Sequence, residues 1–337
     1  MGGGCSHNPP GYNEAYAISL YETALQNTCL LPDVGIDESL MKYSGLNSNA
    51  ELQAYSNELL NSLPGNVEKL GSSLGEMTSI PNAVGLMAMV ISMIMEMAIT
   101  SSQQTSPDTY SLLHRVFGEE KASAVRDKLS QSVTRCHTFM NNDQRLQEEL
   151  RRLEEQLSGH LTTLRNSLLY DNQMSSRGFK IWVNGASFHV QMLIHEARLN
   201  VKARYINKRL SYYVDSIKAT ISLYLQDLER LLEKYKTYKI STTKLAPDQY
   251  CVATGWGNVC KPVNCYIRNT EKTKCAISHS QQNSETCDGC DITEAYINHV
   301  FSRYEPITSL RNHFSTTKNN INSLINQHDT FTLPSIF

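Results

Sequence analysis

Cysteine is the residue whose clustering in this chain most directly suggests chemistry. Six of the nine cysteines fall between residues 251 and 290. Two of them, Cys287 and Cys290, form a C-x-x-C motif whose internal glycine permits the tight turn that brings two sulfurs to one ion. Cys275 and His279 would complete a tetrahedral site of three thiolates and one imidazole. The spacing therefore predicts a structural zinc site, which leaves no open coordination position for catalysis.

Disulfide bonds are the competing interpretation of the same cluster. Six is an even number, and three disulfides would hold together a segment that is too small and polar for a core of its own. Unpaired thiols are the third interpretation. The compartment decides among them, because disulfides are rare in a reducing cytosol and common in an oxidising space. The clustered cysteines outside the zinc tetrad are Cys251, Cys260 and Cys265, and Cys260 and Cys265 are an alternative second pair of metal ligands to Cys275 and His279.

A second chemical signal lies at the start of the chain, which begins MGGGCS. Removal of Met1 exposes the amine of Gly2, and Ser6 stands where the N-myristoylation motif has Ser or Thr. One myristoyl chain gives only reversible membrane binding, so stable attachment needs a basic patch or a second acyl chain. Residues 1–41 contain no Lys or Arg, but a palmitoyl thioester on Cys5 supplies the second chain. We therefore predict lipidation at Gly2 and Cys5, against the alternative of a flexible glycine-rich start.

A basic stretch between residues 198 and 244 is a candidate surface for anionic lipid headgroups. Lys and Arg outnumber Asp and Glu there, and tyrosines are interleaved with them. A solvated helix face that balances acidic parts of the molecule is the alternative. The residues that we assign to the candidate lipid-facing patch are Lys202, Arg204, Lys208 and Arg209.

Composition argues against several classes of function. The formal net charge is −2 over 337 residues, so the chain lacks the strong positive field of nucleic-acid-binding proteins. Neither an H-E-x-x-H motif nor a P-loop occurs. We therefore expect a non-enzymatic protein without a nucleic-acid partner, and structural zinc is the one candidate cofactor. The start lacks the basic and apolar regions of a classical signal peptide, which predicts synthesis in the cytosol.

Leucines at helical spacing predict the elements that position these residues. One stripe covers residues 146–168 with coiled-coil-like steps and one stutter, and a second becomes regular over residues 210–235. The segment 171–185 between them is polar and holds two glycines, so we expect it to connect an antiparallel helical hairpin over residues 139–240. The same stripes are compatible with a homo-oligomer.

Residues 80–100 form the most apolar stretch of the chain. Positions 83–95 carry no charge and include four methionines, but Glu96 then interrupts the run before it reaches the length of about 20 residues that a membrane span requires. A central helix of a bundle is the main interpretation. The alternative is a membrane-perturbing or pore-forming protein that releases this segment into lipid.

We expect a mainly all-α fold, an elongated helical bundle with a small Cys-rich, irregular or β insert before the last helix. The predicted function is a membrane-tethered helical scaffold or interaction protein at the cytosolic face of a membrane, the plasma membrane above all, with proteins as partners. The predicted organisation is an acylated N-terminus at 1–12, a helical bundle at 13–240, the Cys-rich insert at 241–290, C-terminal helices at 291–330 and a tail at 331–337.

Overall fold

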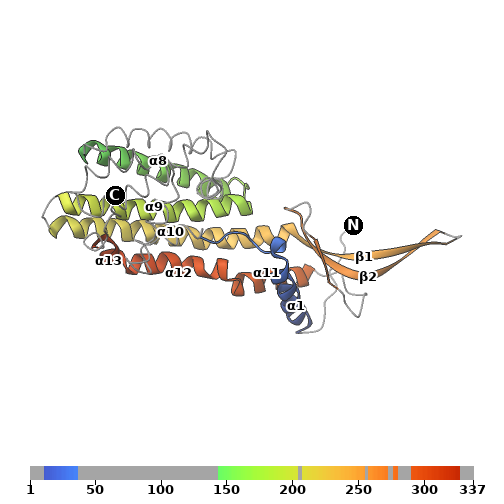
Figure 1. Ribbon diagram of the computed structural model, residues 1–337. Helices are drawn as coiled ribbons and strands as arrows, with labels where there is room; N and C mark the ends of the chain where they lie inside the picture. The colour runs from blue at the N-terminus through green and yellow to red at the C-terminus, as the bar shows by residue number, and fades with distance from the viewer. Residues whose placement is uncertain are drawn as a thin grey trace, which may run out of the picture. The chain divides into compact units, whose positions relative to one another are not determined.

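The computed structural model describes residues 11–36, 143–203, 207–254, 257–271, 276–279 and 290–326 (Figure 1). This part of the chain is mostly α-helical, as predicted, with seven α-helices and three strands. The chain divides into two compact units. One contains the strands with α1, α11 and the last part of α10, and the other contains most of α8, α9 and α10 with the later part of α12 and α13.

Two helices form the core of the first unit. Helix α1 (Tyr12–Gln26) packs against α11 (Cys290–Arg303), and the 3₁₀ turn η1 (Thr28–Leu30) follows α1. The rings of Tyr21 and His299 meet edge-on across this contact, with centroids 5.0 Å apart. The two helices pack because their apolar residues recur at three- and four-residue spacing. The fully buried side chains are Ala17, Leu20, Ala24, Ile292, Tyr296, Ile297 and Val300.

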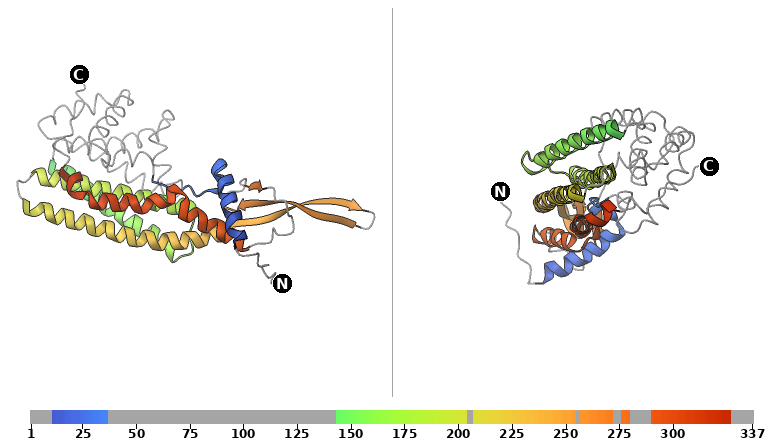
Figure 2. Two further views of the ribbon diagram at one scale, coloured as in Figure 1. Left: turned by 90° about the horizontal axis from the view of Figure 1, so that it is seen from below. Right: turned by 90° about the vertical axis from the view of Figure 1, so that its left-hand side faces the viewer.

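The strands of the first unit form one antiparallel sheet in the order β1-β2-β3. Strand β1 (Thr243–Thr254) pairs with β2 (Gly257–Asn269) along its whole length, with an irregularity between Asp248 and Gln249. Strand β3 (Ala276–His279) pairs only with residues 265–268 of β2. We call residues 248–254 and 257–264 the β-arm. The β-arm extends away from α1 and α11 as a two-stranded ribbon (Figures 1 and 2).

The helices of the second unit follow the leucine stripes. They are α8 (Asp143–Leu169), α9 (Ser176–Ala203), α10 (Asn207–Thr242), α12 (Glu305–Asn319) and α13 (Ile321–Asn326). Leu157, Leu161 and Leu168 of the first stripe are buried. Most positions of the second stripe are buried as well, including Ile217, Ile221 and Leu228, so both stripes face the protein interior.

Helix α9 begins earlier than the sequence pattern predicts. The sequence pattern predicts a polar connection over residues 171–185. This prediction is wrong, because the chain is helical from Ser176 onward. Phe179, Trp182, Val183 and Ala186 are buried at the spacing of one helix face. Their burial outweighs the cost of two internal glycines, about 1 kcal/mol each relative to alanine.

Helices α10 and α12 run antiparallel in the second unit. Arg311 of α12 binds Glu229 of α10, with Nη2 2.6 Å from Oε2. The next contact pairs Tyr224 with Phe314, whose ring centroids are 6.5 Å apart. Residue numbers therefore rise along α12 as they fall along α10. This places Phe314 of α12 against Tyr224 near the centre of α10.

A buried polar trio connects three helices of the second unit. His189 of α9 is 2% exposed, and its Nε2 lies 2.8 Å from Oε1 of Glu154 in α8. A carboxylate can only accept, so Nε2 donates and Nδ1 is left to accept from the hydroxyl of Tyr224, 2.9 Å away on α10. Burial raises the pKa of Tyr224, which keeps this hydroxyl protonated as a donor.

Replacing Tyr224 by phenylalanine tests this trio. The Tyr224→Phe variant leaves the buried Nδ1 of His189 without its donor, and we expect a loss of about 1–2 kcal/mol in the free energy of unfolding. The matched control is Tyr212→Phe on the same helix, because Tyr212 is 81% exposed and its loss should change stability by less than about 0.5 kcal/mol. Urea unfolding of both variants measures the difference. If Tyr224→Phe is as stable as Tyr212→Phe, the hydrogen bond from Tyr224 to His189 contributes nothing to stability.

His313 of α12 should make the stability of the second unit depend on pH. Its Nε2 lies 2.8 Å from the Ser187 hydroxyl, its Nδ1 is buried without a hydrogen-bond partner, and burial lowers its pKa to about 4. Above pH 6.5 neither state binds a proton there. As the pH falls from 6.5 to 4 the unfolded chain takes up a proton and the folded chain does not, so stability falls by about 1.4 kcal/mol per pH unit at most.

The slope of unfolding free energy between pH 6.5 and 5 measures this effect. We expect His313→Gln to flatten the slope, because glutamine takes up no proton in this pH range. An unchanged slope in His313→Gln would assign the acid sensitivity to other groups.

Candidate functional site

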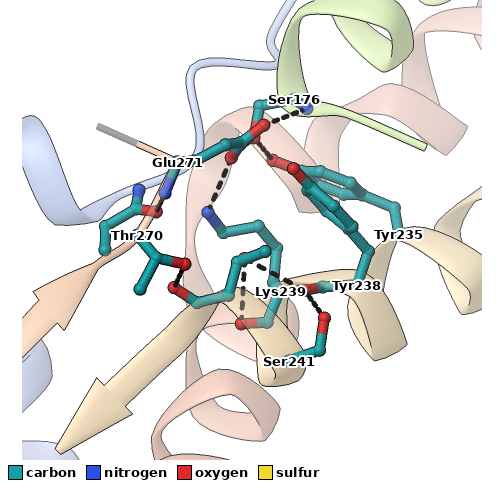
Figure 3. Close-up of polar contacts among 9 residues, drawn as sticks. Ser176, Tyr235, Tyr238, Lys239, Ser241, Thr270 and Glu271 are labelled. Atoms are coloured by element: carbon teal, nitrogen blue, oxygen red, sulfur yellow. Dashed lines mark hydrogen bonds and ion pairs between the residues drawn. The ribbon is translucent and has the colours of Figure 1, made fainter. Parts of the chain in front are cut away.

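A cluster of polar side chains meets at the base of the β1–β2 hairpin (Figure 3). Its centre is Glu271, which follows β2 in a turn. One carboxylate oxygen of Glu271 accepts the backbone N–H of Ser176 at 2.7 Å. The other accepts the Ser176 hydroxyl at 2.6 Å and the ammonium of Lys239 at 3.1 Å. We call Ser176, Tyr235, Tyr238, Lys239 and Glu271 the polar junction.

Local chemistry explains why Glu271 is held at this position. Ser176 is the first residue of α9, where backbone N–H groups lack helical partners and a negative charge is stabilised. The turn that presents Glu271 is itself closed by Asn269, whose Oδ1 accepts the Glu271 N–H at 3.0 Å. Thr270 donates its N–H and its hydroxyl to the carbonyl of Thr242, both at 2.8 Å. The end of β2 is thereby fastened to the end of α10.

Two tyrosines of α10 complete the polar junction. The hydroxyl of Tyr235 lies 2.7 Å from that of Ser176, and the ring of Tyr235 stacks on Tyr238 with centroids 6.3 Å apart. Tyr235 is fully buried and Lys239 is only 1% exposed. The polar groups of the cluster therefore interact with one another in an environment with little water.

The pKa shifts define the charges of the polar junction at neutral pH. Burial raises the pKa of the Glu271 carboxyl, but the hydrogen bonds from Ser176 and the ammonium of Lys239 outweigh it, so the pKa lies below its usual value. Burial also raises the pKa of Tyr235, and raises that of Tyr238 to about 12. Glu271 is thus ionised while both tyrosines stay neutral. No proton is poised to move near pH 7, so the arrangement is suited to fastening elements together.

The predicted metal ligands are only partly within the described residues. His279 is the last residue of β3 and Cys290 the first of α11, whereas Cys275 and Cys287 lie outside the described ranges. Within those ranges no group of three or more His, Cys, Asp or Glu side chains could hold a metal ion. The zinc site therefore stays a prediction.

The other three clustered cysteines occupy defined positions in the sheet. Cys251 of β1 and Cys260 of β2 are Cα partners across the β-arm. Cys265 of β2 stands between two non-cysteine partners, Pro247 of β1 and His279 of β3. Cys260 and Cys265, the alternative second pair of predicted metal ligands, lie on the same strand. Adjacent strands therefore bring Cys251 and Cys260 together.

Cys29 forms a disulfide that the sequence analysis did not predict. This residue lies in η1 and is disulfide-bonded. It stands far from the cysteine cluster in the sequence, and no spacing rule relates it to a partner. Because disulfides are rare in a reducing cytosol, the bond indicates exposure of this chain to a thiol oxidant.

The predicted lipid contacts fall mostly outside the part that the structure describes. Gly2, Cys5, Arg204 and residues 80–100 lie beyond it. Lys202 is in α9, and Lys208 and Arg209 are in α10. Among the described helices, none combines the length and apolar character needed to cross a membrane. Both lipidation and the basic patch stay predictions.

Comparisons with known proteins give no relative from which a function could be transferred. No protein-family model matches the chain. No curated protein and no solved structure matches it either. A functional proposal therefore rests on the motifs and the geometry of this chain.

Replacing Glu271 by glutamine tests the polar junction. The Glu271→Gln variant keeps an oxygen that can accept from Ser176 but removes the charge that pairs with Lys239. The loss of a partner charge beside a buried ammonium is costly, and we expect a loss of about 3 kcal/mol in the free energy of unfolding by urea. The exposed Glu294 of α11 provides the matched control, since Glu294→Gln should change stability by less than about 0.5 kcal/mol.

A double variant separates the charge from the shape of the side chain. Adding Lys239→Met to Glu271→Gln removes the ammonium that has lost the Glu271 charge, so most of the lost stability should return. If the double variant instead loses further stability, equal to the loss that Lys239→Met causes by itself, the two substitutions act independently. The ion pair would then not be what stabilises the polar junction.

Proposed function

We propose that this chain is a membrane-tethered, non-enzymatic interaction protein that presents the β-arm to a protein partner. The observation that carries the tether is the N-terminal motif with Gly2 as acyl acceptor and Cys5 as the second site. The β-arm is the part of the structure that we assign to the contact with the partner. Acyl chains at these two positions would hold the helical body at the cytosolic leaflet, with the plasma membrane as the proposed site.

The β-arm supports the interaction role. A two-stranded hairpin alone in water is at best marginally stable, and among the described residues the two strands of the β-arm pair only with each other. Such a ribbon has no third strand among the described residues. Its outer strand edges carry backbone groups that can pair with an extended segment of another protein.

The finer architecture belongs to the same proposal. We propose that the described helices are part of an elongated bundle containing a coiled-coil-like hairpin, and that residues 241–290 form a Cys-rich insert that carries the β-arm. Support comes from contacts in the second unit, where side chains of α8, α9, α10 and α12 bind one another. Arg165 of α8 also pairs with Asp227 of α10 at 2.9 Å. These contacts support the proposed bundle.

The disulfide at Cys29 adds a requirement about the order of maturation. N-myristoylation uses the free amine of Gly2 and takes place in the cytosol, whereas a disulfide needs an oxidant. We propose that acylation comes first and thiol oxidation second. One sulfur cannot carry both a thioester and a disulfide, so a bond between Cys29 and Cys5 would exclude palmitoylation of Cys5.

Intact-mass spectrometry of the chain from its own cells tests the tether. We expect a mass increase equal to one myristoyl group on the Gly2 amine after loss of Met1, and a further thioester-linked acyl group that hydroxylamine removes. The Gly2→Ala variant should lose the first group and shift from the membrane to the soluble fraction, since a single remaining signal gives only marginal attachment. Gly3→Ala is the matched control because it leaves the acceptor glycine in place, and it should behave as the parent chain. Unchanged membrane partition of Gly2→Ala would overturn the proposal.

A further inference from the structure

The register of the β-arm brings two cysteines together. Between the two strands, Thr254 pairs with Gly257, Ala253 with Asn258 and Val252 with Val259, and the next pair is Cys251 with Cys260. We propose that Cys251 and Cys260 form a disulfide that crosslinks the β-arm. This assignment goes beyond the proposed tether and does not rest on it.

Backbone geometry alone makes this pair suitable for a bond. Directly opposed residues of an antiparallel pair have Cα atoms about 4.5–5.5 Å apart. Disulfides join cysteines whose Cα atoms are about 4.4–6.8 Å apart, so the bond needs no backbone movement. The register shift of the hairpin falls between Asp248 and Gln249, on the side of the pair away from the turn, so Cys251 and Cys260 belong to the regular ladder that leads to the turn. In the three described strands this is the one position where two cysteines are partners.

The β-arm also has a physical need for such a bond. Strand β3 reaches only residues 265–268 of β2, so residues 248–254 and 257–264 lack a third strand within the described sheet. A two-stranded ribbon of this kind frays readily. Pro262 lies within it at a position that pairs with Gln249, and proline supplies no N–H to the ladder. A covalent link near the turn restricts the open states of the ribbon and so favours the paired state.

The bond forms by thiol–disulfide exchange with a disulfide oxidant, either a small molecule or a protein. The thiolate of one cysteine attacks the oxidant, forms a mixed disulfide and releases the first thiol of the oxidant. The thiolate of the other cysteine then attacks the mixed disulfide and releases the second thiol. The two cysteines together lose two protons and two electrons, and one disulfide of the oxidant becomes two thiols. Cys29 is independent support, because its disulfide shows that the same unit contains oxidised cysteine.

Peptide mapping of the full chain from its own cells tests the assignment. Free thiols are alkylated during lysis, and the protein is then digested without reductant. Cleavage after Trp256 separates Cys251 from Cys260 in the sequence, so the two resulting peptides should still travel together and should separate on reduction. Fragmentation should place the alkyl label, if any, on Cys265. Alkylated Cys251 or Cys260 in most molecules, or a bond from either one to another cysteine, would overturn the proposal.

Protection of the β-arm provides a second, functional measurement. Replacing both cysteines in Cys251→Ser/Cys260→Ser should accelerate amide hydrogen exchange in residues 248–264 by roughly tenfold or more, with little change in α11. The matched control is Cys265→Ser, which should leave exchange in the β-arm unchanged. If the double variant fails to fold, Cys251→Ala/Cys260→Ala gives the same comparison, whereas reduction of the parent chain also breaks the bond at Cys29. Equal exchange in the parent chain and the double variant would show that no bond constrains the β-arm.

Discussion

A buried ammonium needs a partner, and this constraint organises the first unit. Lys239 is 1% exposed, so its charge must be balanced inside the protein. Glu271 supplies that balance and also accepts two hydrogen bonds from Ser176. One carboxylate therefore connects the turn after β2, the first residue of α9 and the last part of α10. This ion pair joins the residues just before β1 to those just after β2, at the base of the β1–β2 hairpin.

Sequence patterns predicted the mainly helical fold but not the polar junction. Apolar stripes specify a helix through local spacing, which is why buried positions such as Leu161 and Leu228 follow from the sequence. Glu271 lies 95 residues from Ser176 and 32 from Lys239, and no local rule links groups so far apart. One usable signal was present. Lys239 follows Tyr235 by four residues on the stripe of α10, and a charge at a stripe position requires a carboxylate elsewhere.

The cysteines show where spacing and structure give different information. Spacing selected the C-x-x-C motif and its neighbours, because metal sites are often built from residues close in sequence. Strand register instead relates Cys251 to Cys260, and register depends on the turn and on the pairing of whole strands. The two results are compatible, since they concern different residues. Cys29 also changes the redox question, because one established disulfide makes oxidation of a second pair chemically reasonable.

The β-arm is thus constrained by two interactions of different physical kinds. At its base, the Glu271–Lys239 ion pair stabilises the folded arrangement and depends on the ionised carboxylate, so it weakens as the pH falls through the lowered pKa of Glu271. Near its turn, a Cys251–Cys260 disulfide would restrict the unfolded states and would respond to reductant, not to acid. The two ends can therefore loosen independently. Reduction would free the part of the β-arm that we propose as the partner contact while its attachment to α10 stays in place.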